Sequence, residues 1–451
     1  MPEDRRPVAS TGNPRLHTDS PDSVDEITHL VNLALDDYER GLLNGVNGPA
    51  VQLAMRILTR MAPMYGASSL LAITRAHIDG VILTGTAGLA FAERLATLDG
   101  QVAVPTSLNV MSMDRERSRE LNLDADFAEK ARRLGQAYVA MGARPTFTCA
   151  PYQTENAPSF GEQIAWSESN AVAFANTVIG ARTNRYGDYL DICCALTGRA
   201  PAAGLHLDEP RLATVVVELQ SIPPELPLRD DFYPVLGYLL GSIVANEVPV
   251  VNGLDCRPSQ DQLKAMAAAA ASSGEVAMFH IVGITPEATT LAEALGDRRP
   301  RRTVPVSMGN LRRTRESLST TAGSRVDVVA FGSPHCSLAE CRALAALMAG
   351  TRASEAVEVF VTTSRAVRDL LARSGELAVI ESFGARVTAD TCIVVAPLIK
   401  PTAKVLMTNS AKYAHYGPGL LSVDSVFATT EECVASAIAG KVIRAEGPWA
   451  A

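Results

Sequence analysis

Long apolar runs are absent from the 451-residue sequence, and none approaches the roughly 20 residues that a membrane-spanning helix needs. The N-terminal stretch 1–23 is polar and proline-rich, and it lacks the apolar segment of a secretory signal peptide. We therefore expect residues 1–25 to form a disordered polar tail and the protein to be cytoplasmic, with no membrane partner. In that compartment its eight cysteines should be reduced thiols or metal ligands rather than disulfides.

Extended basic surfaces are also scarce. The formal net charge is −8, and the dense arginine group RRPRRT (298–303) fits a solvated turn. No nucleic-acid partner is therefore expected. The glycine patterns of nucleotide sites, G-x-G-x-x-G after a strand and the P-loop, are missing too.

The apolar patterning instead predicts a large α/β protein. Residues 25–61 have a helical pattern, whereas 275–284 are strand-like. From VDVVAF (326–331) onward, strand and helix patterns alternate regularly, as they do in parallel sheets flanked by helices. We expect one folded region in two parts, residues 26–305 and a C-terminal α/β subdomain of residues 306–451.

Three cysteines share a local context. Cys336 lies in FGSPHCSLAEC, between an apolar strand pattern and a helix that Ser337 is expected to cap. Cys149 and Cys392 likewise lie at or beside the end of an apolar strand. Because strand ends gather at one edge of a sheet, the three thiols could converge on a metal, and thiolates suit iron–sulfur clusters, zinc or copper(I). The alternative is core packing, which we favour for Cys193, Cys194, Cys341 and Cys433.

Two histidine–carboxylate pairs also invite a metal site. They are His77 with Asp79 in AHIDG, and His206 with Asp208 in LHLDE. A histidine near a strand end is more often hydrogen-bonded within the core than bound to a metal. We therefore favour hydrogen-bonded histidines at both places.

Polar residues in apolar settings complete the candidates. Taken together, hydroxyl and backbone donors at helix starts with one lysine suit a carboxylate or phosphate ligand. These residues are Ser68 and Ser69 at an expected helix start, Asn109 in an expected turn, Ser167 and Ser169 as expected N-caps beside Glu168, and Lys412.

Seven stretches resemble the aconitase X family, in family order from about residue 30 to the C-terminus. They are YGASSLLAITRAHIDG, VPTSLNV, the long segment TCAPYQTENAPSFGEQIAWSESNAVAFANTVIGARTNR, LTGRAPAAGLHLDE, MFHIVGITPEA, FGSPHCSL and TNSAKYAHYGPG. The resemblance implies an aconitase-like α/β fold of several subdomains and hydro-lyase (dehydratase) chemistry. The polar tail lies outside it.

The resemblance also implies residue roles. An iron–sulfur cluster, 2Fe-2S or 4Fe-4S, or a mononuclear iron would be held by Cys149, Cys336 and Cys392. Glu168 and Lys412 would be catalytic, with Lys412 facing a substrate carboxylate or phosphate and Glu168 bonded to the leaving hydroxyl. The implied substrate contacts are Gly66, Ala67, Ser68, Asn109, Glu168, Ser169 and Lys412.

The family further implies a small swivelling domain that supplies a proton-abstracting serine. We expect it on a separate small subunit, since the sequence has no room for it after the last matching motif. Segment 180–208 resembles the bacterial branch, which dehydrates cis-3-hydroxy-L-proline to Δ1-pyrroline-2-carboxylate through the enamine. The alternatives are a phosphomevalonate dehydratase large subunit, a dehydratase of another small hydroxy-acid, and a non-catalytic iron–sulfur sensor.

Overall fold

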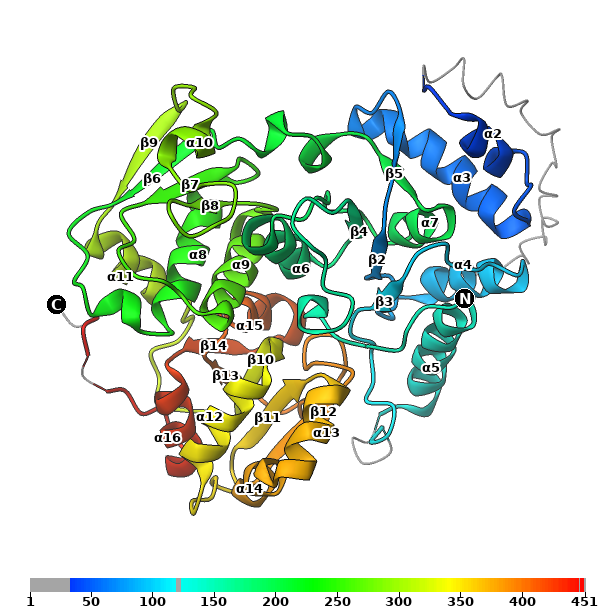
Figure 1. Ribbon diagram of the computed structural model, residues 1–451. Coiled ribbons are helices and arrows are strands. Elements are labelled where there is room, and N and C mark those ends of the chain that lie inside the picture. The colour runs from blue at the N-terminus through cyan, green and yellow to red at the C-terminus, as the bar shows by residue number, and fades with distance from the viewer. Residues whose placement is uncertain (1–32, 119–122, 446, 450–451) are drawn as a thin grey trace, which may run out of the picture.

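The computed structural model describes residues 33–118, 123–445 and 447–449, so the expected tail 1–25 lies outside the described residues. Three sheets of parallel strands follow one another along the chain, each with helices packed on it (Figure 1). They have the strand orders β3-β2-β4, β8-β7-β6-β9 and β12-β11-β10-β13-β14. The expected α/β class is confirmed. In the described ranges, every helix is too short or too polar to cross a membrane.

The first region contains the three-stranded sheet and a small antiparallel pair, β1 with β5. Its buried strands are short, and helices enclose them. Helix α6 continues directly into a π-helical turn at Ala175–Ile179. The elements are α2 (Asp37–Leu43), α3 (Pro49–Met61), β1 (Leu70–Ala72), β2 (Arg75–Ile78), α4 (Thr86–Thr97), β3 (Thr106–Leu108), α5 (Ala125–Ala140), β4 (Ile164–Trp166), α6 (Ser169–Phe174), α7 (Leu190–Thr197) and β5 (Arg199–Pro201).

The second region packs α8 tightly on α9. A Cβ atom on Gly274 would lie 1.9 Å from the Gly241 carbonyl oxygen, so the two helices can approach this closely only with glycine at the contact. The elements are β6 (Val215–Leu219), α8 (Phe232–Val244), β7 (Pro249–Asn252), α9 (Gln260–Gly274), β8 (His280–Ile281), α10 (Leu291–Leu295), β9 (Arg302–Val306) and α11 (Met308–Ser317).

The strand expected over 275–284 is confirmed only at β8. Side chains of the π-helical turn form hydrogen bonds with the backbone that precedes β8. Asn176 donates to the Ala277 carbonyl at 3.0 Å, and Thr177 accepts from the Phe279 amide at 3.0 Å. Those backbone groups are therefore satisfied without a sheet partner.

The third region has the predicted strand–helix alternation. Ser337 caps α12 in a capping box with Glu340, as its position before the apolar pattern predicts. The elements are β10 (Val328–Cys336), α12 (Leu338–Met348), β11 (Glu358–Thr363), α13 (Arg365–Ser374), α14 (Glu376–Phe383), β12 (Ala385–Ala389), β13 (Val405–Thr408), α15 (Ala411–Tyr416), β14 (Asp424–Phe427) and α16 (Thr430–Ala439).

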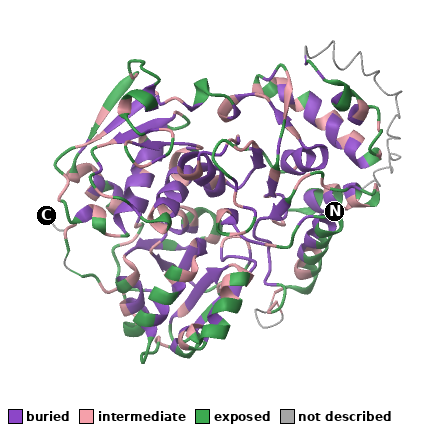
Figure 2. Cartoon of the chain, in the orientation of Figure 1, coloured by how far each residue is buried: buried purple, intermediate pink, exposed green. Residues whose placement is uncertain are grey.

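The three regions meet around α6, α9 and α15, which pack on one another near the middle of the molecule (Figure 1). Figure 2 shows buried residues concentrated along the sheets and these central helices. The polar side chains considered below come from the ends of strands and helices that point into this junction.

Candidate active site

An ion pair joins the first and third regions at the junction. Lys412, in the first turn of α15, places its Nζ 2.6 Å from Oε1 of Glu168, which directly precedes α6. The other carboxylate oxygen, Oε2, accepts from the Ala171 amide at 2.8 Å and from the Asn170 side chain. Glu168 and Lys412, both expected in one substrate site, are thus in direct contact, while their catalytic roles stay a prediction.

Glu168 is itself the N-cap of α6. The expectation that Ser167 and Ser169 are N-caps is therefore wrong, because Ser169 is the first helical residue and the Ser167 hydroxyl has no partner among the described residues. Glutamate is an unusual cap, since serine and aspartate have the shorter reach that the position favours. Here the Glu168 carboxylate caps α6 and pairs with Lys412 at the same time.

The ion pair keeps both partners charged. Burial would raise the pKa of Glu168, but the Lys412 charge and the hydrogen bonds from Lys412, Ala171 and Asn170 outweigh it and lower that pKa below its usual value. Burial would lower the pKa of Lys412, yet the Glu168 carboxylate raises it. Glu168 is consequently an anion at neutral pH and has no proton to give.

Asn109 enters the same neighbourhood from the end of β3. Its side-chain amide donates to Oδ1 of Asp79, which follows β2. The Asp79 amide in turn donates to the buried Asp191 carboxylate at 2.7 Å. Removal from water, followed by the charge of Glu168, raises the pKa of Asp79 to about 8. Asn109 and Asp191 hold Asp79 in place, in keeping with the hydrogen-bonded arrangement favoured for the His77–Asp79 pair over a metal site.

The segment Gly66–Ala67–Ser68 lies apart from these contacts. The expected helix start at Ser68 and Ser69 is wrong, because Ser69 bridges Ala34 and the chain continues into strand β1. Gly66 has φ +76°, a left-handed conformation that favours glycine at the end of the preceding turn. Within the described residues, no hydrogen bond links this segment to Glu168, Asn109 or Lys412, so its substrate role stays a prediction.

Cys336 and Cys392 reach the same edge of the third sheet. Cys336 is the last residue of β10, and Cys392 follows the end of the parallel strand β12. A Cβ atom on Gly332 (φ +99°) would lie 2.1 Å from the Thr362 carbonyl oxygen. Glycine therefore lets β10 shift its register against β11 just before Cys336.

Cys149 approaches this edge from the first region. Its Sγ accepts a hydrogen bond from the His335 amide at 3.2 Å, beside Cys336. All three predicted thiols act on the hydroxyl of buried Tyr413, whose pKa is raised by burial first and then by Cys392, Cys149 and Cys336. The three cysteines thus share Tyr413 as an electrostatic neighbour, while their convergence on one metal stays a prediction. Sequence reasoning missed Tyr413, for which only its place three residues after the cap Ser410 gave a signal.

The donor chemistry around these thiols suits iron. Backbone N–H groups of Val394 and Val395 face the Cys392 thiol, and the His335 amide faces Cys149. Such donors tune the potential of thiolate-bound iron, but they only partly oppose burial, which raises the pKa of Cys392 and raises that of Cys149 to about 12; the hydrogen bond with Cys341 and burial raise the pKa of Cys336. As they stand, no three His, Cys, Asp or Glu side chains of the described ranges are gathered closely enough to hold a metal ion. The three thiols are therefore chemically suitable as iron ligands, and their arrangement around an iron centre stays a prediction.

The histidines of the site region are hydrogen-bonded, as expected. His206 lies 2.5 Å from both the Tyr186 hydroxyl and the Gln163 side chain, and His77 Nδ1 lies 2.8 Å from the Ser107 hydroxyl. Burial lowers the pKa of His77 to about 3. Both histidines are therefore neutral.

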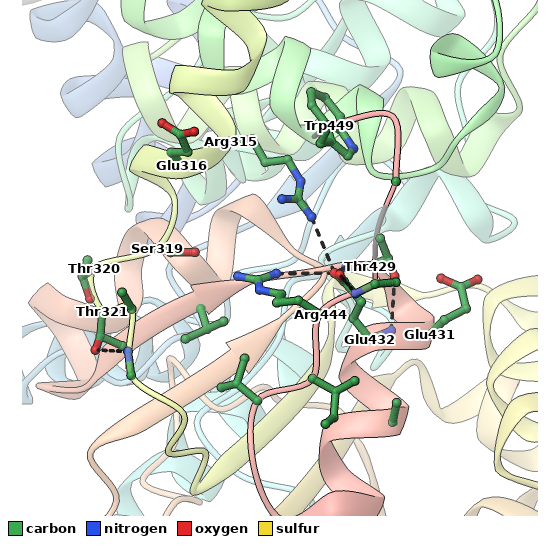
Figure 3. A pocket seen from close by; sticks show the side chains of 18 of the residues that line it. Arg315, Glu316, Ser319, Thr320, Thr321, Thr429, Glu431, Glu432, Arg444 and Trp449 are labelled. Atoms are coloured by element: carbon green, nitrogen blue, oxygen red, sulfur yellow. Dashed lines mark hydrogen bonds and ion pairs between the residues drawn. The ribbon is translucent and has the colours of Figure 1, made fainter. Parts of the chain in front are cut away.

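Two cavities differ in their relation to the candidate residues. One of about 510 Å³ is lined by Lys264, Cys336 and Ser410 and so reaches the strand end that carries Cys336. A larger one of about 1020 Å³ lies between α11, β14, α16 and the C-terminal segment. Figure 3 shows Arg315 and Arg444 of that cavity turned toward the Glu432 carboxylate. None of the predicted site residues lines the larger cavity.

Three family models match the chain in domain order. The model described as the aconitase X first domain matches residues 32–209, the second domain matches residues 213–316, and the third domain matches residues 326–439. The crystal structure of Thermococcus kodakaraensis aconitase X in its holo-form superimposes with a TM-score of 0.80 at 35% sequence identity, over 90% of this chain and 100% of that one.

The curated relatives are dehydratases, which are hydro-lyases. A cis-3-hydroxy-L-proline dehydratase of Pseudomonas aeruginosa is 47% identical over 438 residues, covering 95% of this chain and 75% of the relative. A phosphomevalonate dehydratase large subunit of Methanothermobacter thermautotrophicus is 39% identical over 396 residues, covering 87% of this chain and 96% of the relative. The chain belongs to the aconitase X family.

Proposed function

We propose that this chain is the large subunit of an iron-dependent hydro-lyase that dehydrates cis-3-hydroxy-L-proline to Δ1-pyrroline-2-carboxylate through the enamine. The observation that carries the proposal is the 47% identity over 95% of the chain with an enzyme named for that substrate, against 39% for the named phosphomevalonate dehydratase. A buried lysine at the junction of all three regions supplies the cation that a substrate carboxylate needs.

The chain's own residues have the following roles. Lys412 binds the substrate carboxylate and shares its charge with Glu168, which holds the ammonium group in place. Asn109 orients the substrate from the end of β3. The remaining proposed contacts are Gly66, Ala67, Ser68 and Ser169. Because Asn109 and Glu168 are buried, a polar contact made there acts in a medium where it is stronger than in water.

Cys149, Cys336 and Cys392 are the proposed ligands of an iron–sulfur cluster or a mononuclear iron. When bound, such a group supplies a Lewis acid for the leaving hydroxyl. The support is that all three thiols act on Tyr413 and that N–H groups face two of them.

Replacing one ligand tests the iron site without any assay of turnover. We expect Cys336→Ser to lose the visible absorbance and most of the iron of anaerobically purified protein, because serine is a poor substitute for thiolate. Cys256→Ser is the matched control, since Cys256 lies beside Tyr233 and the Pro227 carbonyl, away from the site. Full iron content in Cys336→Ser would remove Cys336 from the ligands.

A separate small subunit is part of the proposal. The support is the name of the archaeal relative, a large subunit that this chain covers to 96%. The bacterial relative is matched over 75% of its length, so it contains further sequence with no counterpart in the match. We propose that the missing base acts from this second unit.

The experiment is a turnover assay of the anaerobically purified chain together with the small subunit. It offers cis-3-hydroxy-L-proline and (R)-5-phosphomevalonate side by side. Turnover of the proline alone is the expected result. Turnover of the phosphate alone would replace the proposed substrate and turn Lys412 toward a phosphate, whereas bound iron with neither activity would favour another small hydroxy-acid or a sensor role.

A further inference from the structure

The dehydration proposed above needs a proton donor as well as a base. Hydroxide is a poor leaving group, and a positioned acid that protonates it contributes a factor of about 10² to 10⁴ to the rate. Glu168 cannot be that acid, because its pKa is lowered and its two oxygens are occupied by Lys412, Ala171 and Asn170. The raised pKa of Lys412 makes it a poor donor as well.

Asp79 is held differently. Its backbone is fixed from behind, because its own amide donates to Asp191 at 2.7 Å, and Asp191 also accepts from the Ile192 amide at 2.6 Å. Asp191 lies fully buried, whereas Asp79 is partly exposed at the end of β2. The Asp79 side chain accepts a hydrogen bond from the Asn109 amide.

The charges that act most on Asp79 belong to carboxyl groups. They come from three elements: Glu168 before α6, Asp188 in the loop before α7, and Asp191 inside α7. Among the described residues, no lysine, arginine or histidine forms an ion pair with Asp79. Burial contributes most to the raised pKa of about 8, these carboxylates add to it, and the Asn109 hydrogen bond opposes it. Burial also raises the pKa of Asp191, to about 7, so the two groups titrate as a coupled pair in which Asp79 holds its proton to the higher pH.

Asn109 carries an independent sign of the same state. With its amide nitrogen directed at Asp79, its carbonyl oxygen Oδ1 is buried and has no partner. A buried acceptor of this kind costs about 1–3 kcal/mol. If Asp79 carries a proton, the amide can turn so that Oδ1 accepts from the acid. The amide NH₂ is then free for the substrate, which is the role already proposed for Asn109.

We propose that Asp79 is the general acid of the reaction, donating the proton with which the substrate hydroxyl leaves as water. The inference rests on the proposed function. A base of the second subunit takes the proton from C2, and the electron pair of that C–H bond forms the C2–C3 double bond. The C3–O bond breaks with its pair on oxygen, and the Asp79 proton completes the water. The proton on the base returns to Asp79 through solvent.

Asp79→Asn tests the proposal, because asparagine keeps the shape and the hydrogen bond to Asn109 but has no acidic proton. With cis-3-hydroxy-L-proline we expect kcat to fall by about 10² to 10⁴ while KM stays within a few-fold. The wild-type enzyme should lose kcat/KM tenfold per pH unit above about pH 8. That alkaline decline should vanish in Asp79→Asn and return in Asp79→Glu, which restores an acid. A decline caused by the substrate amine would persist in all three.

Infrared spectroscopy of the wild-type holoenzyme gives a readout that needs no turnover. A protonated carboxyl band that titrates near pH 8 should be present in the wild type, absent from Asp79→Asn and shifted in Asp79→Glu. If the wild type turns over no substrate, the proposed function fails; the infrared band then decides the state of Asp79 alone. Wild-type kcat in Asp79→Asn, or a band that titrates near pH 4, would overturn the inference. If Asp79→Asn does not fold, the wild type and Asp79→Glu are compared in both the pH profile of kcat/KM and the infrared band.

Discussion

Two carboxyl groups of one site, Glu168 and Asp79, are held in opposite electrostatic surroundings. Both follow strands of the same three-stranded sheet, and both are withdrawn from bulk water. Glu168 faces a lysine and two further donors, the Ala171 amide and the Asn170 side chain, so its pKa is lowered. Asp79 faces three carboxylates and one amide, so its pKa is raised to about 8.

The difference teaches that burial alone does not set the state of an acid. Burial pushes both groups toward the neutral form, and a single cation, Lys412, reverses the outcome for one of them. A site that separates two acids in this way obtains an anion and a proton donor at the same pH. Dehydration needs both kinds of group.

Removing the Lys412 cation should have the largest effect, because it removes the group that makes Glu168 differ from Asp79. Lys412→Met leaves Glu168 buried without its partner, and we expect the free energy of unfolding to fall by about 3–5 kcal/mol, because an unpaired buried charge is strongly destabilising. Urea unfolding of the anaerobic protein measures it. Glu168 should then take up a proton at neutral pH, as Asp79 does.

Two further variants make this outcome decisive. Lys400→Met removes a lysine that is 64% exposed and pairs with Glu358 at 3.5 Å, so it should cost less than about 1 kcal/mol. Glu168→Gln in the Lys412→Met background should recover much of the lost stability. Equal losses for Lys412→Met and Lys400→Met would show that the buried pair contributes nothing special.

The sequence predicts the framework of this site better than its electrostatics. The strand–helix alternation after residue 306, the cap Ser337 and the common edge of Cys336 and Cys392 all follow from local patterns. The alternation and the cap depend on residues within a few positions of one another. The common edge follows because both cysteines lie at the carboxyl ends of parallel strands in one sheet.

The opposite states of Glu168 and Asp79 could not be predicted in the same way. Asp79 meets Asp191 across 112 positions, and Glu168 meets Lys412 across 244. A pKa is the sum of such distant contacts, and local patterns do not contain them. The same reason explains the wrong caps at Ser167 and Ser169: the pattern predicts a cap by type, whereas Lys412 and Asn170 fix Glu168 in that position.

The pH dependence of stability should have opposite signs for the two acids. The folded pKa of Asp79 is raised from 3.8 to about 8, so the folded protein binds a proton that the unfolded chain has lost, and this contribution to stability falls as pH rises through that window. The folded pKa of Glu168 is lowered, so its contribution is present above its ordinary pKa of 4.5 and is lost as pH falls through the folded value.

Urea unfolding at several pH values separates the two. Between pH 4 and 8, the stability of Asp79→Asn should decline less with pH than that of the wild type, by at most about 1.4 kcal/mol per pH unit. Solvent reaching Asp79 makes the change smaller. Glu168→Gln should differ from the wild type on the acid side instead. Parallel curves for wild type and Asp79→Asn would mean that Asp79 is ionised in the folded protein.

The smallest effect comes from the outermost of the three carboxylates around Asp79. Asp188 is exposed at the loop before α7, and its charge helps to raise the pKa of Asp79. Asp188→Asn should therefore move the alkaline decline of kcat/KM to lower pH, by less than about one unit because solvent screens an exposed charge. The shift should shrink further when salt is added.

Asp126→Asn is the control for this variant. It removes an equal charge, exposed on α5 and paired with Lys130, that does not act on Asp79, so it should leave the pH profile unchanged. An equal shift in both variants would reflect net charge rather than the local field at Asp79.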